Sequence, residues 1–266
     1  MKKALIMTSV AFLLLLAVVA AGLNVIFTVT YIDASFSTIS VQGEEEAKAL
    51  KKELDEFVGD SMTFLDLSDI EETVEKYPCF RVERVNKKFP KTVEVVVKER
   101  KELFAYKTED GNYAMIDSEG QCIRVSDENV SRTGGENIIL KNFRLNVEVG
   151  ERAEGDYFDA LLKTFSGFAA YIADARTNIR EVTLLGSGDE ENPLTNRFNI
   201  EMQEGVFVEL YNPLSYAEEK AKRAIEEYDK LGDVTRMYGC ITVTEVNGAP
   251  GTINAAYMQH RVEHDA

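Results

Sequence analysis

The sequence of 266 residues has no tryptophan and only two histidines, His260 and His264. Histidine is the usual acid–base group near neutral pH. A Ser-His-Asp or Cys-His arrangement would therefore have to recruit one of these two residues. Their spacing of four places them on one face of a helix, where they could bind a metal ion. Their acidic, weakly patterned surroundings favour a solvent-exposed terminus instead.

Cysteine is also scarce. Cys79, Cys122 and Cys240 are far apart and odd in number, which excludes a disulfide framework and a Cys-x-x-Cys metal site. We expect Cys79 and Cys122 to be buried, inert thiols. Four carboxylates lie close together in the sequence: Asp55, Asp60, Asp66 and Asp69. Solvation of helix faces and helix capping explain them better than acid–base catalysis does. The sequence predicts no catalytic residue, no metal site and no cofactor.

Positive charge is in deficit. The net charge is −16, and residues 33–266 carry 28 basic and 46 acidic groups, a net of −18, because only Lys2 and Lys3 precede Asp33. Such a surface repels phosphate backbones, so we expect no nucleic-acid partner. One local set of residues is basic: Arg81, Arg84, Lys87, Lys88, Lys91, Lys98, Arg100 and Lys101. It forms either a solvated face of the hairpin or a contact for an acidic partner or for phospholipid headgroups.

Charge is absent altogether from residues 4–32. A bilayer core of ~30 Å needs about 20 apolar residues in a helix, so this segment is long enough to span it. Lys2 and Lys3 form a short cytoplasmic tail, and the positive-inside rule puts residues 33–266 outside the membrane. The alternative is a cleaved signal peptide, since Val19-Ala20-Ala21 resembles a cleavage site. The apolar run continues past that point, which favours the transmembrane helix.

The next part of the chain predicts a small mixed sheet covered by two helices. A short strand over 36–41 is closed by Gly43, and a helix follows from Glu44 to Val58. A second helix is capped by Ser68 and stopped by Pro78, whose ring has no N–H to donate. Residues 78–100 then form a hairpin, because valines 93, 95 and 97 alternate with their neighbours at the two-residue period of a strand.

After Arg100 the pattern predicts a mixed-sheet β domain with two helices, and the fold class is therefore α+β. We place a first domain at 34–101, the β domain at 102–251 and a tail at 252–266. The helices are capped by Asp156 and by Ser215. The last strand that the pattern predicts could be an open edge that accepts a partner strand, or the tail from 252 to 258 could cover it. Its residues are Cys240, Ile241, Thr242, Val243 and Thr244.

The layout resembles the FtsQ/DivIB family of bacterial cell-division proteins. The resemblance covers nearly the whole chain and rests on the order of short motifs behind the apolar segment. These are Ile39-x-Val41-x-Gly43, Phe64-x-Asp66, Tyr77-Pro78 with Val82, Lys88-Phe89-Pro90-Lys91-Thr92, Val95-x-Val97-x-Glu99-Arg100 and Ile116-Asp117-x-Glu119-Gly120. Two features depart from the family: no proline follows the Glu-Arg pair at 101–105, and the acidic-hydrophobic-Arg signature is not visible around 241–243.

The resemblance implies a POTRA-like domain followed by the family's β domain. It also implies a non-enzymatic divisome scaffold, held in the cell membrane as a single-pass type II protein and enriched at the division septum. Its implied partners are FtsB/DivIC- and FtsL-like bitopic proteins and the septal peptidoglycan synthase. One alternative is another membrane-anchored POTRA-type binding or translocation-assisting protein. An extracytoplasmic enzyme or solute-binding domain is disfavoured, because the sequence offers no nucleophile–base pair.

Overall fold

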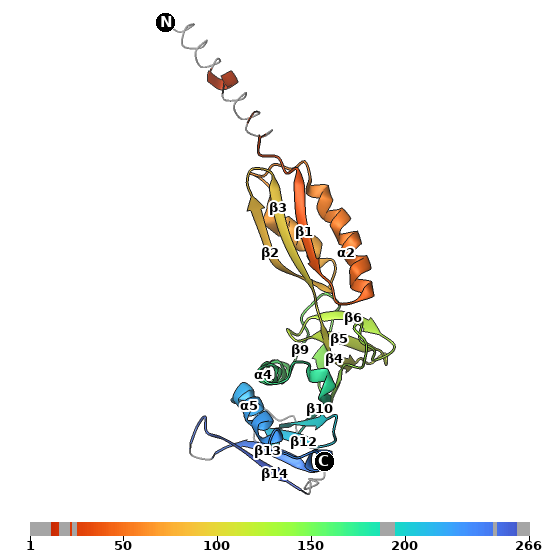
Figure 1. Cartoon of the computed structure of the whole chain (residues 1–266), viewed down its shortest axis with the longest axis vertical. Helices are drawn as coiled ribbons and strands as arrows, with labels where there is room; N and C mark the ends of the chain where they lie inside the picture. The colour runs from red at the N-terminus through yellow and green to blue at the C-terminus, as the bar shows by residue number, and fades with distance from the viewer. Residues whose placement is uncertain (1–11, 16–21, 23–25, 187–194, 247–248, 260–266) are drawn as a thin grey trace. The chain divides into compact units, whose positions relative to one another are not determined.

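The computed structural model describes residues 12–15, 22, 26–186, 195–246 and 249–259. It divides into two compact units, Met1–Arg100 and Lys101–Ala266 (Figure 1). Most of the predicted transmembrane segment, the possible cleavage site at 19–21 and both histidines lie outside the described residues. Among the residues that are described, no helix is long and apolar enough to cross a membrane.

Unit 1 has the predicted order of strand, two helices and two strands. Strand β1 (Tyr31–Ser37) is followed by α2 (Val41–Leu54), the 3-10 turn η1 (Asp55–Phe57), α3 (Leu67–Glu75), β2 (Phe80–Lys88) and β3 (Thr92–Glu99). The sheet order is β1-β3-β2, with β1 parallel and β2 antiparallel to the central β3.

The core of unit 1 lies between this sheet and its helices. Val93, Val95 and Val97 of β3 are fully buried, which confirms the alternation predicted for this strand. Helix α2 contributes Leu50 and Leu54 to the same core, because residues four apart share one face of a helix.

Three expectations for unit 1 are wrong in detail. The strand predicted over 36–41 is β1, which begins at Tyr31, and Val41 is already the first residue of α2. Helix α3 is capped by Asp66, whose side chain accepts a hydrogen bond from the Ser68 N–H, and not by a Ser68 capping box. The predicted transmembrane segment ends too late, since Ile32 belongs to the core of unit 1. The charge-free residues that precede the folded part of unit 1 are therefore 4–26.

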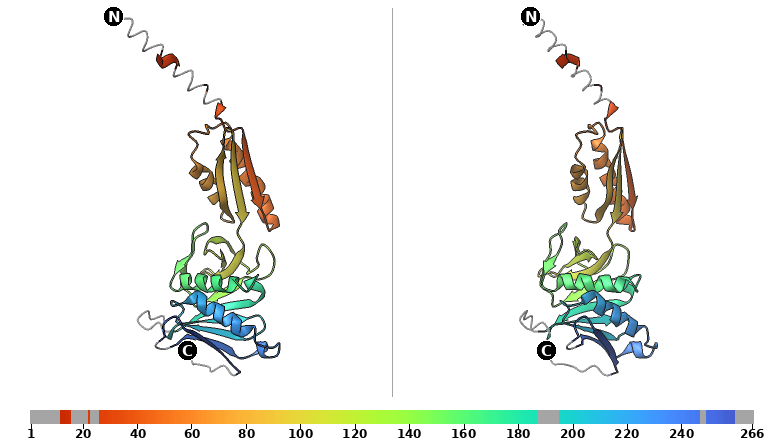
Figure 2. Two further views of the ribbon diagram at one scale, coloured as in Figure 1. Left: turned by 60° about the vertical axis from the view of Figure 1, so that its left-hand side comes forward. Right: turned by 90° about the vertical axis from the view of Figure 1, so that its left-hand side faces the viewer.

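Unit 2 is a nine-stranded mixed sheet with two helices, in the order β14-β13-β12-β11-β10-β7-β4-β5-β6. Helices α4 (Phe158–Ala169) and α5 (Ala217–Tyr228) lie side by side against the sheet (Figure 2). The strands are β4 (Glu102–Lys107), β5 (Tyr113–Asp117), β6 (Cys122–Ser126), β7 (Ile138–Lys141), β10 (Ile179–Leu185), β11 (Arg197–Met202), β12 (Phe207–Tyr211), β13 (Cys240–Glu245) and β14 (Ile253–Met258). A separate pair joins β8 (Leu145–Asn146) to β9 (Glu154–Gly155).

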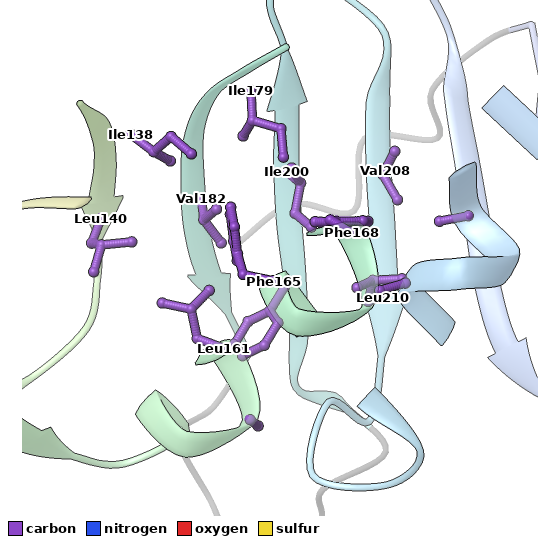
Figure 3. Packing of buried hydrophobic residues seen from close by; sticks show 14 of the residues in the cluster. Ile138, Leu140, Leu161, Phe165, Phe168, Ile179, Val182, Ile200, Val208 and Leu210 are labelled. Atoms are coloured by element: carbon purple, nitrogen blue, oxygen red, sulfur yellow. The ribbon is translucent and has the colours of Figure 1, made fainter. Parts of the chain in front are cut away.

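The core of unit 2 lies between the sheet and its two helices, and both sides contribute aromatic and aliphatic side chains. Figure 3 shows Phe165 and Phe168 of α4 packed over Val182, Ile200 and Val208. The Phe165 and Phe168 rings meet edge to face with centroids 5.4 Å apart, an arrangement that the ring quadrupoles favour. This packing holds α4 on the sheet.

Both helix caps predicted for unit 2 are wrong. The residues before α4 and α5 are Tyr157 and Tyr216, which adopt left-handed backbone conformations and cap with no side-chain hydrogen bond. The Ser215 hydroxyl instead lies 3.2 Å from Glu245 Oε2 in β13. Because tertiary contacts recruit Ser215, its local capping potential is not used.

Candidate partner-binding edge

The segment predicted as an open edge, 240–244, lies inside the sheet as β13. It pairs in parallel with β12 on one side and antiparallel with β14 on the other. The register runs from Cys240 opposite Met258 to Glu245 opposite Ile253. The edge expectation for β13 is therefore wrong, and the alternative, a cover formed by the following segment, is confirmed. The assignment of 252–266 to a tail is wrong for the residues of β14.

The open edge of this sheet end is β14. The Val246 N–H donates to the Thr252 carbonyl at 2.8 Å, which fixes the phase of the hydrogen-bond ladder. In an antiparallel pair, successive residues point their backbone groups alternately toward and away from the partner strand. Ile253, Ala255 and Tyr257 therefore direct their N–H and C=O groups outward. Within the described part of the chain, no strand pairs with this outer side.

The sequence of β14, Ile-Asn-Ala-Ala-Tyr-Met, carries no charge. Natural proteins protect exposed edges with charged side chains, with bulges or with a covering segment. The edge strand β2 of unit 1 follows this rule, since it has five charged residues among nine. The opposite edge of unit 2, β6, is partly covered, because the Cys122 N–H donates to the Glu151 carbonyl at 2.9 Å. Among these edges, β14 alone is both uncharged and uncovered by described residues.

Exposed apolar side chains lie beside the end of β14, and we call them the terminal apolar patch. The Tyr257 hydroxyl is 3.3 Å from the Thr235 carbonyl and 3.2 Å from the Tyr238 carbonyl, so it holds the 3-10 turn η4 (Thr235–Met237) next to the strand. The patch consists of Val234, Met237, Tyr238 and Met258, of which Val234 and Met237 are each 68% exposed.

The family-motif residues Gly43 and Glu99 form one structural contact. The Glu99 carboxylate is 2% exposed and accepts hydrogen bonds from the Ile39 N–H at 2.6 Å, the Ser40 N–H at 3.0 Å and the Ser40 hydroxyl. Ser40 caps α2 by accepting from the Gly43 N–H at 2.9 Å. A Cβ on Gly43 would lie 2.2 Å from Glu99 Oε2. Glycine is therefore required where α2 approaches this carboxylate.

Motif residue Pro78 precedes β2, and Arg100 follows β3 and bonds to the residues where β2 begins. The Arg100 N–H donates to the Cys79 carbonyl at 2.7 Å and its Nε donates to the Phe80 carbonyl at 3.2 Å. Tyr77, just before Pro78, donates its hydroxyl to Glu53 Oε1 at 2.6 Å, and this bond raises the pKa of Tyr77 to about 12. The Arg100 bonds tie the end of β3 to the start of β2, and the Tyr77 bond ties the residues after α3 to α2.

Motif residues Phe89 and Pro90 form the exposed tip of the β2–β3 hairpin and are joined by a cis peptide bond. The predicted basic set around this hairpin is partly neutralised. Glu83 lies 3.7 Å from Arg81 and 3.9 Å from Lys98. Glu94 is shared by Arg84, at 3.2 Å, and by Lys88, whose hydrogen bond lowers the pKa of Glu94.

The remaining candidates form no reactive centre among the described residues. All three cysteines are buried, as expected for Cys79 and Cys122. Burial raises the pKa of the Cys122 thiol to about 11, which disfavours the thiolate. No group of three or more metal-ligating side chains occurs in the described ranges.

Two comparisons with known proteins bear on this architecture. Residues 34–100 match the family model for the POTRA domain, FtsQ-type. The chain is also 26% identical over 148 residues to the cell division protein FtsQ of Neisseria gonorrhoeae (strain ATCC 700825 / FA 1090). That match covers 54% of this chain and 53% of the relative, so the chain spans about half the length of the curated relative.

Unit 1 is thus a POTRA domain of the FtsQ type, followed by a mixed-sheet unit with two helices. Together with the motif order, the two matches support an FtsQ/DivIB family protein.

Proposed function

We propose that this protein is a non-enzymatic scaffold of bacterial cell division, which binds other division proteins through the outer edge of β14. The FtsQ-type POTRA domain and the FtsQ relative support a role in cell division. The binding site rests on one observation: β14 is an uncharged end strand with outward backbone groups at Ile253, Ala255 and Tyr257.

The partner we infer is an extended segment of a single-span division protein, of the FtsB/DivIC or FtsL kind. Such a segment would add a strand to β14, so that main-chain hydrogen bonds give affinity and alternate side chains give specificity. The terminal apolar patch lies at the Met258 end of the strand and offers a surface for the partner's apolar side chains. The septal peptidoglycan synthase is a further proposed partner of the assembled complex.

The proposed location is the cell membrane at the division septum. Residues 4–26 are free of charge and number 23, which exceeds the ~20 residues that a membrane-spanning helix needs. Lys2 and Lys3 favour a cytoplasmic N-terminus and place both folded units outside. The POTRA domain at 34–101 and the following β domain would then act as separate binding modules held by one anchor.

The test replaces Ala255 in the full-length protein by proline. Because the Ala255 N–H points away from β13, Ala255→Pro keeps the intramolecular ladder, and edge strands tolerate proline in this position. The proline ring blocks an incoming strand and removes one donor. We expect recovery of single-span division proteins from detergent extracts to fall by at least about tenfold, given a steric block added to a lost hydrogen bond of ~1 kcal/mol.

Ala255→Ser is the matched control, since it keeps the N–H and a small side chain. Both variants are first compared with the parent for membrane insertion and thermal unfolding. Equal recovery of the partners by a folded, membrane-inserted Ala255→Pro protein would contradict the edge-strand site. Recovery of no single-span division protein by the parent itself would contradict the proposed function.

A further inference from the structure

One end of the POTRA unit collects exposed apolar residues that the proposed partner site does not use. Phe64 is 80% exposed and Phe89 is 61% exposed. Phe64 follows the loop 58–62, and Phe89 forms the tip of the β2–β3 hairpin. We call Phe64, Phe89 and the neighbouring Lys91 the end face.

Hydrogen bonds bring these two loops together at the point where the chain enters the domain. The Met62 N–H donates to the Phe27 carbonyl at 2.7 Å, and the Thr30 N–H donates to the Lys91 carbonyl at 2.9 Å. The chain at 27–30 is therefore held between loop 58–62 on one side and the hairpin on the other. Phe27 also packs edge to face on Phe89, with ring centroids 6.0 Å apart.

The segment that joins this end is the charge-free run 4–26. Phe27 is the first residue after it, so Phe89 touches the residue at which the apolar run meets the domain. Aromatic side chains are enriched where protein meets the membrane–water interface, and lysine places its ammonium among lipid headgroups. Lys91 is exposed and forms no salt bridge with a described residue. Asp60 is also exposed nearby, and its negative charge opposes that of Lys91. The apolar side chains therefore carry most of the interaction with the lipid.

We propose that the end face rests in the headgroup region of the bilayer, with Phe89 and Phe64 inserted at its boundary with the acyl chains. The domain is then docked on the lipid as well as tethered to it, and its orientation is restricted. This inference rests on the proposed membrane anchor, and it adds a lipid-binding surface that the scaffold role by itself does not require.

The absence of tryptophan makes a direct test possible, because any introduced tryptophan is the sole indole fluorophore. Full-length Phe89→Trp and Phe64→Trp are reconstituted into phosphatidylcholine vesicles that contain lipids spin-labelled near the headgroup. Ile39→Trp is the matched control: Ile39 is 47% exposed and donates its N–H to Glu99 at the far end of β3. At ~3.3 Å per residue, it is roughly 20–25 Å from the hairpin tip.

We expect tryptophan at 89 and at 64 to be quenched by the labelled lipid at least about twofold more than tryptophan at 39, since interfacial groups sit ~5–10 Å inside the headgroup boundary. They should also be protected from aqueous iodide. Quenching at 89 and 64 no greater than at 39 would overturn the inference. Protection from both lipid and iodide would overturn it too, because a protein surface would then cover the end face.

Flotation of the vesicles separates failure of the inference from failure of the anchor. Protein that floats with the vesicles after alkaline extraction, yet shows no quenching at 89, contradicts the end-face proposal alone. Protein that does not float contradicts the proposed anchor and the end-face proposal together. Adding phosphatidylserine to the vesicles should strengthen the quenching of Phe89→Trp, because Lys91 is attracted to anionic lipid. The increase should be smaller when Phe89→Trp is combined with Lys91→Gln.

Discussion

At the scale of single residues, the buried charges of unit 2 have structural explanations. The Glu102 carboxylate is 2% exposed and accepts from Arg124 Nε at 2.8 Å and Nη2 at 3.2 Å, and from the Arg132 N–H at 3.1 Å. Lys220 of α5 is fully buried and donates to the carbonyls of Tyr211 and Asn212 at 2.9 and 2.7 Å. Each buried charge is therefore hydrogen-bonded, Glu102 to the Arg124 side chain and a backbone N–H, and Lys220 to backbone carbonyls, as buried charges require.

Lys220 predicts a pH dependence of stability. Burial lowers its pKa from 10.5 to about 8, against a smaller opposing effect of Glu245. Between these values the unfolded chain binds the proton and the folded chain does not, so the free energy of unfolding rises with pH through this window. We expect the stability difference between the parent and Lys220→Met to shift in favour of the parent as pH increases from 8 to 10.5, measured by urea denaturation at a series of pH values.

Lys222 serves as the control on the same helix. It is partly exposed, and its hydrogen bond to Glu218 raises its pKa, so the parent should gain nothing over Lys222→Met as pH rises. A flat parent-minus-variant difference for Lys220→Met across pH 8 to 10.5 would contradict the assignment of a depressed pKa to Lys220.

At the scale of elements, periodicity predicted most of the fold and local capping signals did not. The alternating valines of β3 and the apolar stripe of α4 were readable, because burial on one face imposes a fixed spacing. The caps of α3, α4 and α5 were not, because competing partners decide them: Ser215 pairs with β13, and Asp66 replaces Ser68. The sequence predicts β14 only as a possible cover for β13, because Asn254 and the two alanines give a weak strand signal.

The N-terminus of α2 gives a prediction with a definite sign. Helix propensity alone favours alanine over glycine by ~1 kcal/mol. At Gly43, however, a methyl group would displace the Glu99 carboxylate from three donors, and hydrogen bonds to charged groups contribute ~1.5–3 kcal/mol each. The second effect is larger, so Gly43→Ala should destabilise unit 1 by about 2–4 kcal/mol. Native-state hydrogen exchange of peptides from 41–54 measures this change.

Gly232→Ala is the control, since a Cβ at this position meets no atom within 4 Å. It should leave stability within about 0.5 kcal/mol of the parent, as surface substitutions usually do. Slower exchange in α2 of Gly43→Ala than of the parent would show that propensity prevails and that the Glu99 contact is weak.

At the scale of the whole molecule, the family could be read from motif order, whereas the place of the site could not. Gly43, Glu99 and Arg100 indicate the POTRA domain because each occupies a position with a structural requirement. The sequence predicts β13 as the partner-binding edge, whereas the open edge is the next strand, β14. Whether a strand is an edge depends on whether a later segment of the chain pairs with it. The net negative charge of the folded part remains consistent with protein or zwitterionic lipid partners and not with nucleic acid.

The central claim is that β14 presents its outer edge to single-span division proteins outside the membrane. Site-specific photocrosslinking in dividing cells tests it most directly, with a benzophenone residue at Ala256 on β14 and at Val125 on the opposite edge strand β6. We expect crosslinks from position 256 to small single-span division proteins and none to them from position 125. Equal crosslinking at both positions, or none from 256 while the protein is at the septum, would contradict the claim.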